Sequence, residues 1–404
     1  MNFKDTKQVG FETYIHTYIH TYNKDIDYIV WGYGDAYRLF TKSVGDIIKI
    51  RYIIDSDVAK QGETPDRIEI KSPHGLQGED KHDAKIIIIP TGDMADQIIN
   101  ELKIMGFDES NYCFANDIII SFNYFYNKKI VIPNASICVT TKCTLNCHGC
   151  SEYIPYLKEQ RNIEMEIIKR DIDLLFNKVD FCGEIAFSAG ENFLNEELGE
   201  IIDYIYSKYS NKYLRIACNT NGTVLIKTNI LQSIKKANCQ IRISDYPASS
   251  KIEQIIQLLK ENDIRYLVND NFSFGTNRRG TWFDFGIPLV SHNKSIEEKK
   301  YLFRNCQLYC RMLHNGTFYY CPTQFGATVS GLYNANREND ILNLAKAKEI
   351  DIIKFFLGYN DNGYINFCDR CDGMGSAINK NTIPAGIQMS KDEMEKLGNR
   401  SNCF

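Results

Sequence analysis

Three cysteines close together in the chain place the strongest constraint on what it can fold into. Cys143, Cys147 and Cys150 lie within eight residues, directly after an apolar stretch, Ser136 to Thr140, that is typical of a buried strand. A loop this short wraps one compact centre, and three thiolates leave one iron of a [4Fe–4S] cubane without a protein ligand. A zinc ion would need a fourth ligand, for which His148 is the alternative, although it lies between two of the cysteines.

Composition favours metal binding over disulfides. The chain has 14 cysteines in 404 residues and a formal net charge of −4. Its first residues lack the basic head and apolar run of a signal peptide, and no apolar run is long enough to cross a bilayer. We therefore expect a cytoplasmic protein with no nucleic-acid or membrane partner, whose clustered cysteines bind metal.

The amino-terminal third shows the pattern of a nucleotide-binding sheet. Tyr28 to Trp31 is typical of a strand, the turn Gly32-x-Gly34 follows it, and Asp55 lies at about the spacing of a ribose-binding acid. The third glycine of that motif is absent, with Tyr37 in its place. The region resembles the Rossmann-like modules attached to bacterial polysaccharide-modifying proteins, so it either binds a nucleotide-linked group or docks a partner.

From residue 135 strand and helix patterns alternate again, which is typical of an open parallel sheet or of a full or partial barrel. The expected strands are Ser136–Thr140, Glu184–Phe187, Tyr213–Cys218, Gln240–Ser244 and Arg265–Val268, and the expected helices include Met165–Lys178 and Ile252–Asn262.

The spacing Cys-x3-Cys-x2-Cys after a strand resembles the signature of the radical S-adenosylmethionine (SAM) superfamily. The resemblance implies that Cys143, Cys147 and Cys150 hold a [4Fe–4S] cluster whose open iron binds SAM. It also implies a 5′-deoxyadenosyl radical that abstracts a substrate hydrogen, and a reductant such as flavodoxin or ferredoxin. His148-Gly149 departs from the family pattern, in which many members place an aromatic residue that contacts adenine.

Polar residues at the ends of the later strands resemble further elements of these barrels. Ala189-Gly190-Glu191 resembles the Gly-Gly-Glu element that binds the methionine amino group, with Ala189 in place of the first glycine and Glu191 as the acceptor of the ammonium. Asn219 and Ser244 end the third and fourth strands, where side chains face a barrel's active site, and Ser244 is a candidate contact to ribose or carboxylate.

A second cysteine group lies in the carboxyl-terminal part. Cys306, Cys321, Cys368 and Cys371 have the number of thiols that a fully ligated cluster needs, and Gly316 with its aromatic neighbours is typical of a β-hairpin. The group resembles the twitch domain, the short form of the SPASM domain, which carries one auxiliary [4Fe–4S] cluster. Structural zinc is the alternative for these four thiols.

The roles of several other residues stay open at this point. Cys310 either replaces Cys306 as a ligand or returns a hydrogen atom to a substrate radical, as a cysteine does in some related sugar epimerases. Arg242 and Asp245 either serve the site or form a surface pair. The paired arginines at 278 and 279 either hold a phosphate or sugar nucleotide, or pack two domains together.

These observations predict an α/β protein of three domains. They are a Rossmann-like domain (1–127), a partial (β/α)6 radical SAM barrel (135–290) and a twitch-like domain (300–404). The expected function is hydrogen abstraction, in the dehydrogenation or epimerisation of a sugar, cyclitol or nucleotide-linked sugar. The alternatives are radical modification of a peptide and a zinc-stapled scaffold without activity.

Overall fold

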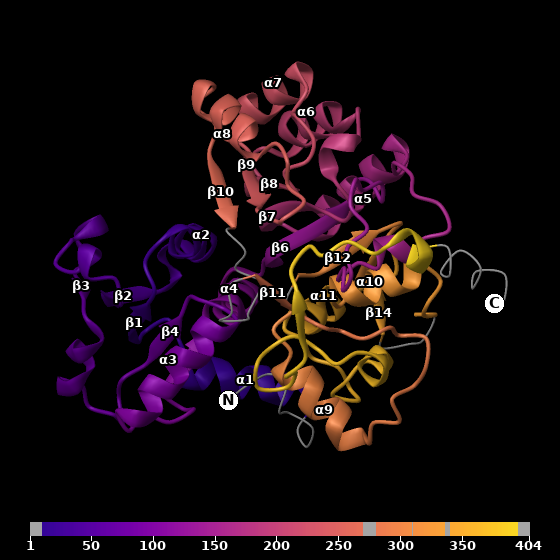
Figure 1. Ribbon diagram of the computed structural model, residues 1–404. Helices are drawn as coiled ribbons and strands as arrows, with labels where there is room; N and C mark the ends of the chain where they lie inside the picture. Colours follow the sequence, from indigo (N-terminus) through magenta and orange to yellow (C-terminus); the bar gives the residue numbers. More distant parts are fainter. Residues whose placement is uncertain (1–9, 270–279, 309, 336–339, 395–404) are drawn as a thin grey trace. The chain divides into compact units, whose positions relative to one another are not determined.

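The computed structural model describes residues 10–269, 280–308, 310–335 and 340–394 (Figure 1). The chain forms two compact units. The first is drawn from Met1–Pro133, Val179–Gly183 and Glu349–Gly363, and the second from Asn134–Lys178, Glu184–Lys348 and Tyr364–Phe404.

The first unit is built on a parallel sheet of five strands in the order β3-β2-β1-β4-β5, which is the strand order of doubly wound nucleotide-binding folds. The strands are β1 (Asp27–Trp31), β2 (Lys49–Ile54), β3 (Ile70–Lys71), β4 (Ile86–Ile88) and β5 (Tyr112–Phe114). Continuous apolar runs form β1 and β4 because both faces of a central parallel strand are buried.

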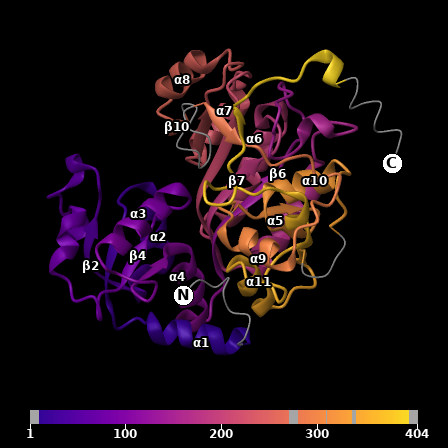
Figure 2. The ribbon, with the colours of Figure 1, turned by 60° about the horizontal axis from the view of Figure 1, so that its bottom comes forward.

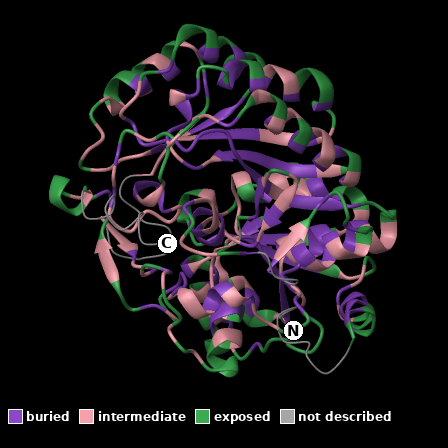
Figure 3. Ribbon diagram, turned by 90° about the vertical axis from the view of Figure 1, so that its right-hand side faces the viewer, coloured by how far each residue is buried: buried purple, intermediate pink, exposed green. Residues whose placement is uncertain are grey.

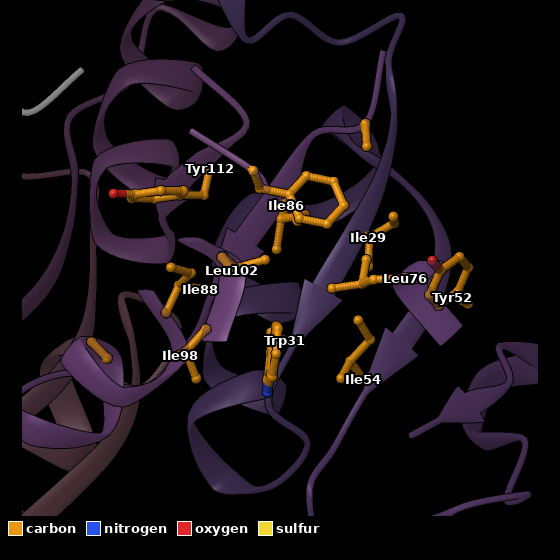
Figure 4. Packing of buried hydrophobic residues seen from close by; sticks show 13 residues of the cluster. Ile29, Trp31, Tyr52, Ile54, Leu76, Ile86, Ile88, Ile98, Leu102 and Tyr112 are labelled. Carbon is orange, nitrogen blue, oxygen red and sulfur yellow. The ribbon is translucent and has the colours of Figure 1, made fainter. Parts of the chain in front are cut away.

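Helices supply the other half of this unit's core. They are α1 (Phe11–Thr21), α2 (Asp35–Val44), α3 (Asp93–Ile104), α4 (Ala115–Phe122) and α11 (Glu349–Phe356). Trp31 and Ile54 of the sheet pack in one cluster with Ile98 and Leu102 of α3 (Figure 4). The amphipathic pattern of α3 therefore buries one side of the helix against the strands.

The acid expected at a ribose has a structural role in the glycine turn. Asp55 accepts a hydrogen bond of 2.8 Å from the backbone N–H of Tyr33 and pairs with Lys60 at 3.2 Å. These bonds connect the turn after β1 to the end of β2. Nucleotide binding by this unit stays a prediction.

The second unit contains a sheet of eight strands in the order β10-β9-β8-β7-β6-β12-β13-β14. Figure 2 labels β6, β7 and β10 of this sheet. Its strands are β6 (Val131–Cys138), β7 (Phe181–Ser188), β8 (Tyr213–Thr220), β9 (Gln240–Ser244), β10 (Tyr266–Asn269), β12 (Met312–His314), β13 (Thr317–Tyr319) and β14 (Ile341–Asn343). The helices between its first five strands are α5 (Met165–Lys178), α6 (Leu198–Tyr209), α7 (Thr228–Lys236) and α8 (Ile252–Glu261). The α/β class with repeated parallel βα units is thus confirmed.

The two faces of strands β7 to β9 differ in chemistry. One face carries fully buried apolar residues, such as Ile185, Ile216 and Ile243. Figure 3 shows buried strands with helices packed over them. The opposite face, which we call the inner face, carries residues two apart along each strand. These are Glu184, Ala186 and Ser188 on β7, Arg215, Ala217 and Asn219 on β8, and Gln240, Arg242 and Ser244 on β9.

The cysteine-rich region adds strands to this same sheet. β12 pairs in parallel with β6, and β13 and β14 continue the sheet in antiparallel pairing. Asn315 and Gly316 form the two-residue turn between β12 and β13, and both have positive φ, as a hairpin turn of this type requires. The expected hairpin is confirmed.

This region has further elements outside the eight-stranded sheet. They are α9 (Ile296–Asn305), α10 (Pro322–Val329) and a two-stranded sheet of β11 (Thr281–Phe283) and β15 (Thr382–Pro384). In the part of the chain that the structure describes, no helix is long and apolar enough to cross a membrane.

Candidate active site

The first cysteine loop follows β6. Cys143 and Cys150 are half-buried and Cys147 is buried. Burial raises the pKa of Cys143 to about 11, and the nearby Cys147 thiol adds to the rise. Burial also raises the pKa of Cys150, and Cys147 again contributes. The loop therefore brings its three thiols into one electrostatic environment, as the spacing predicts.

Amide groups from distant parts of the sequence donate to two of these sulfurs. The side chain of Asn221, at the end of β8, donates to Sγ of Cys143 at 3.5 Å, and that of Gln388 donates to Sγ of Cys147 at 3.1 Å. Such donors stabilise thiolate ligands.

A carboxyl-terminal segment holds Gln388 in place. His148 N donates to the carbonyl of Ile387, and Met389 N donates to that of Asn146, each at 2.8 Å. The side-chain oxygen of Gln388 accepts from Asn146 N at 2.7 Å. This segment could not be predicted from the sequence, because it pairs with residues more than two hundred positions away.

The donor set fits a [4Fe–4S] cluster better than a zinc ion. Among the described residues, no three His, Cys, Asp or Glu side chains converge where one ion could be held. A cubane does not require such convergence, because each thiolate binds a different iron. The imidazole of His148 faces Glu393 at 3.4 Å instead of completing a four-ligand set with the cysteines.

Gly190 joins the end of β7 to the cysteine loop. Its φ is +53°, and a Cβ atom at this position would clash with the carbonyl oxygen of Lys142. Glu191 N donates to that same oxygen at 2.7 Å. Only glycine permits this close approach. The Ala189-Gly190-Glu191 stretch is therefore in direct contact with the start of the cysteine loop.

Glu191 is fully buried, and its carboxylate binds neighbouring strand ends. It accepts from Asn221 N at 2.7 Å, from the hydroxyl of Thr220 at 3.0 Å and from Phe193 N at 3.2 Å. Burial raises its pKa to about 7. These contacts hold Asn221 beside Cys143, and a direct contact of Glu191 with a methionine ammonium stays a prediction.

Asn219 and Ser244 end neighbouring strands on the inner face. Asn219 donates to the carbonyl of Phe187 at 3.0 Å, which ties β8 to β7. Ser244 lies next to Tyr246, and its carbonyl accepts from Ser249 at 3.1 Å. Both residues are half-buried and lie at the carboxyl ends of parallel strands, where ligands bind in such sheets.

The inner face also carries an ion-pair group that the sequence did not reveal as a unit. Glu184 on β7 pairs with Arg215 on β8 at 2.5 Å and with Arg242 on β9 at 2.6 Å. Arg242 thus pairs with Glu184 and forms no ion pair with Asp245 among the described residues. Alternation along three strands was the signal available, but their register could not be read from the sequence. The arginines at 278 and 279 lie outside the described residues.

Glu152 is a second acid that sequence reasoning missed, because it lies in a loop without a periodic pattern. Its carboxylate accepts from Ala189 N at 3.1 Å, and burial raises its pKa to about 7.

The second cysteine group gathers thiols that are far apart in the chain. Burial raises the pKa of Cys371, and Cys321, Cys306 and Cys368 each raise it further. Backbone N–H groups donate to two of the sulfurs, Gln324 N to Cys321 and Gly373 N to Cys371, both at 3.3 Å. Cys306, Cys321 and Cys368 thus lie within electrostatic reach of Cys371, and their role as ligands of one cluster stays a prediction.

Cys310 lies within electrostatic reach of the ion-pair group. Burial raises the pKa of its thiol, Glu184 and Glu152 add to the rise, and Arg242 opposes it. The residue is nonetheless exposed.

One segment of the chain matches the model of a known protein family. Residues 137–244 match the model of the Radical SAM superfamily. An uncharacterized protein of Methanocaldococcus jannaschii, MJ0907, is 38% identical over 168 residues, which are 39% of this chain and 52% of that protein. The chain thus spans about half the length of the curated relative it matches.

Solved structures are similar over more of the chain but at low identity. BtrN in complex with AdoMet and 2-DOIA is 16% identical, with 60% of this chain and 93% of that chain covered and a TM-score of 0.39. The enzyme anSMEcpe with bound AdoMet is 14% identical, with 66% and 96% covered and a TM-score of 0.40. Proteins of the matched superfamily use SAM and a [4Fe–4S] cluster. Residues 137–244 of this chain are therefore similar to the Radical SAM superfamily.

Proposed function

We propose that this protein is a radical SAM epimerase that inverts one carbon centre of a sugar, a cyclitol or a nucleotide-linked sugar. The position of Cys310 carries the proposal. This thiol lies within electrostatic reach of Glu184, Arg242 and Glu152. It is not needed to complete the proposed set of four cysteine ligands, so it is available to react with substrate.

The two cysteine groups would hold the redox groups. Cys143, Cys147 and Cys150 are the proposed ligands of the SAM-binding cluster, which supplies a 5′-deoxyadenosyl radical when SAM is bound. The proposed ligands of an auxiliary [4Fe–4S] cluster are Cys306, Cys321, Cys368 and Cys371. For SAM itself we propose contacts from the stretch Ala189, Gly190 and Glu191, and from Asn219 and Ser244.

Cys310 would donate a hydrogen atom to the substrate radical. The S–H bond breaks, a C–H bond forms on the face opposite to abstraction, and a thiyl radical remains on Cys310. An electron from a ferredoxin or flavodoxin, together with a proton, restores the thiol. The raised pKa of Cys310 favours this role, because the donor must be a thiol and not a thiolate.

Dehydrogenation is the competing reaction on the same scaffold. In that reaction the substrate radical loses an electron and a proton, and no hydrogen returns to carbon. The two reactions differ in product mass, so one measurement separates them.

The test uses anaerobically reconstituted enzyme with SAM, dithionite and a panel of free and nucleotide-linked sugars in deuterium oxide. Epimerisation incorporates one deuterium from the exchangeable thiol of Cys310 and forms one 5′-deoxyadenosine per product. A product two mass units lighter than substrate would instead establish dehydrogenation and contradict the role of Cys310.

Cys310→Ala and Cys182→Ala are matched variants. Cys310→Ala should still form 5′-deoxyadenosine but should lose deuterium incorporation. Cys182 is a fully buried thiol on β7, and its variant should retain incorporation. Full incorporation in Cys310→Ala would exclude this thiol as the donor.

A further inference from the structure

We propose that Arg311 raises the reduction potential of the auxiliary cluster that we assign to the second cysteine group. Arg311 is a positioning residue in this proposal, because it acts through that cluster and through Cys310 and not on the substrate. The inference rests on the proposed function, which assigns both the cluster and the role of Cys310. It adds a residue that serves the two together.

The fold places Arg311 between Cys310 and the start of α10. Arg311 directly precedes β12, and its carbonyl accepts a hydrogen bond of 2.9 Å from Ser136 N, where β12 pairs with β6. Tyr320 directly follows β13 and directly precedes Cys321. Because β12 and β13 pair in antiparallel register, the residue before β12 comes to lie beside the residue after β13. Arg311 is therefore brought next to Tyr320.

Two contacts hold the guanidinium group of Arg311 against Tyr320. Its Nη1 donates to the backbone carbonyl of Tyr320 at 2.5 Å. Its central carbon lies 5.2 Å from the centre of the Tyr320 ring, within the range of a cation–π contact. The bonded carbonyl belongs to the peptide group that joins Tyr320 to Cys321, and Arg311 is only 6% exposed. A positive charge is thus buried in a fixed position beside a proposed cluster ligand.

This charge acts on thiols in both of the proposed roles. Burial raises the pKa of Cys321, and Arg311 opposes the rise. Burial also raises the pKa of Cys310, and there Arg311 opposes the rise together with Arg242. A nearby positive charge has this effect because it stabilises the thiolate. It stabilises any other gain of negative charge at these two positions in the same way.

A cation in this position should change the reduction potential of a cluster. The potential of an iron–sulfur cluster depends on net charge, on hydrogen bonds to the sulfurs and on solvent exposure. A cluster with four thiolate ligands is negatively charged, and reduction makes it more so. The guanidinium group of Arg311 favours the reduced state, and the low effective dielectric constant around a buried charge strengthens the effect. We therefore expect Arg311 to raise the potential.

The proposed epimerisation uses an electron at Cys310 in each turnover. The thiyl radical gains an electron from the ferredoxin or flavodoxin and becomes a thiolate, and a proton then restores the thiol. A positive charge near Cys310 stabilises the thiolate between these two events. Arg311 therefore favours a gain of negative charge at Cys310 as well as at the auxiliary cluster.

Potentiometric titration with electron paramagnetic resonance tests this proposal on the reconstituted enzyme without substrate. Arg311→Gln removes the charge and keeps an N–H donor for the carbonyl of Tyr320, whereas Arg311→Lys keeps both. At the midpoint potential of the parent's auxiliary cluster, the ratio of reduced to oxidised cluster should be about tenfold lower in Arg311→Gln. This ratio corresponds to a shift of about 59 mV for a one-electron couple. Arg311→Lys should stay close to the parent, and the SAM-binding cluster should keep its potential in both variants.

Several results would overturn the proposal. One is an unchanged potential in Arg311→Gln. Another is an equal fall in Arg311→Gln and Arg311→Lys, because the charge would then not be the cause. Iron analysis accompanies each titration, and Arg311→Met serves as a second neutral variant. Loss of the auxiliary cluster from both neutral variants would show that Arg311 has a structural role instead.

Arg170→Gln is the matched control. Arg170 is exposed and bonds to Asn315 in the turn between β12 and β13, so its variant removes an equal charge at the other end of the same hairpin. It should leave both potentials unchanged.

Failure of the proposed function would be seen separately. A lowered potential in Arg311→Gln without deuterium incorporation by the parent would contradict the epimerisation and leave the role of Arg311 standing. Deuterium incorporation with an unchanged potential in Arg311→Gln would do the reverse. About four irons per chain in the parent, in place of about eight, would contradict the auxiliary cluster and the role of Arg311 together.

Discussion

The two cysteine groups of this protein are assembled in different ways. The first takes three thiols from one loop, and side-chain amides of Asn221 and Gln388 donate to its sulfurs. The second takes four thiols from three parts of the chain, and backbone N–H groups of Gln324 and Gly373 donate to its sulfurs.

This difference corresponds to a difference in chemistry. Three thiolates leave an iron open to SAM, whereas four thiolates close a cluster to ligands and restrict it to electron transfer. A single substitution can remove a side-chain donor, whereas the fold keeps a backbone N–H donor in place. The first group is therefore suited to a reactive centre and the second to a stable one.

Removing one thiol from each group should have the largest effect. Cys147→Ala is expected to abolish formation of 5′-deoxyadenosine, because SAM loses its iron. Cys371→Ala is expected to retain SAM cleavage and lose product formation. Each variant should fall from about eight irons per chain to about four. Iron and sulfide analysis with quantification of 5′-deoxyadenosine checks this. Equal SAM cleavage by both variants would contradict the division of roles.

Gly190→Ala should disturb the first cysteine group (Cys143, Cys147 and Cys150) and leave the second cysteine group unchanged. Its Cβ would meet the carbonyl of Lys142, so the loop must move away from the end of β7. We expect a loss of about 2 kcal/mol or more in unfolding free energy and failure to assemble the SAM-binding cluster. The spectrum of the second cluster should persist.

Ala189→Gly is the matched control for Gly190→Ala. Ala189 already has a φ of +72°, which glycine adopts without strain. This change should raise stability by up to about 1 kcal/mol. A loss of stability would show that the alanine methyl group is needed there.

Acid should weaken the hairpin that leads to Cys321. Burial, together with smaller contributions from Arg161 and Arg170, lowers the pKa of His314 on β12 to about 4. The unfolded state, with a pKa near 6.5, binds a proton more readily than the folded state, so stability falls as pH drops from about 6.5 toward 4. Between pH 8 and pH 5 the loss is about 2 kcal/mol. His314→Phe should remove this dependence, measured by denaturant unfolding across pH. If the unfolding free energy of His314→Phe depends on pH as that of the parent does, another titratable group causes the dependence.

Local patterns in the sequence predicted the elements well. Met165–Lys178 and Gln240–Ser244 match α5 and β9 to the residue, because apolar periodicity and neighbouring turns define both. The strand expected from Ser136 instead begins at Val131, since Asn134 interrupts its apolar run. The cysteine loop was equally predictable, because its ligands are adjacent in sequence.

Contacts between distant segments could not be predicted in this way. The pairing of β12 with β6, the bond from Gln388 to Cys147 and the shared carboxylate of Glu184 all depend on tertiary packing. Arg242 shows the limit clearly. Its position at a strand end was evident, but Asp245 was the candidate partner, and the register of three strands selects Glu184 instead.

The smallest expected effect tests the side-chain donors of the first group. Gln388→Met keeps the length of the side chain and removes the N–H that donates to Cys147. A hydrogen bond to a cluster thiolate stabilises the reduced, more negative state, so its loss should lower the reduction potential of the SAM-binding cluster by tens of millivolts, equivalent to about 1 kcal/mol. The second cluster, with backbone donors, should keep its potential. Potentiometric titration followed by electron paramagnetic resonance resolves the two. If the reduction potentials of both clusters shift, or if neither shifts, the hydrogen bond from Gln388 does not act on the SAM-binding cluster alone. That result would contradict the proposed difference between side-chain and backbone donors.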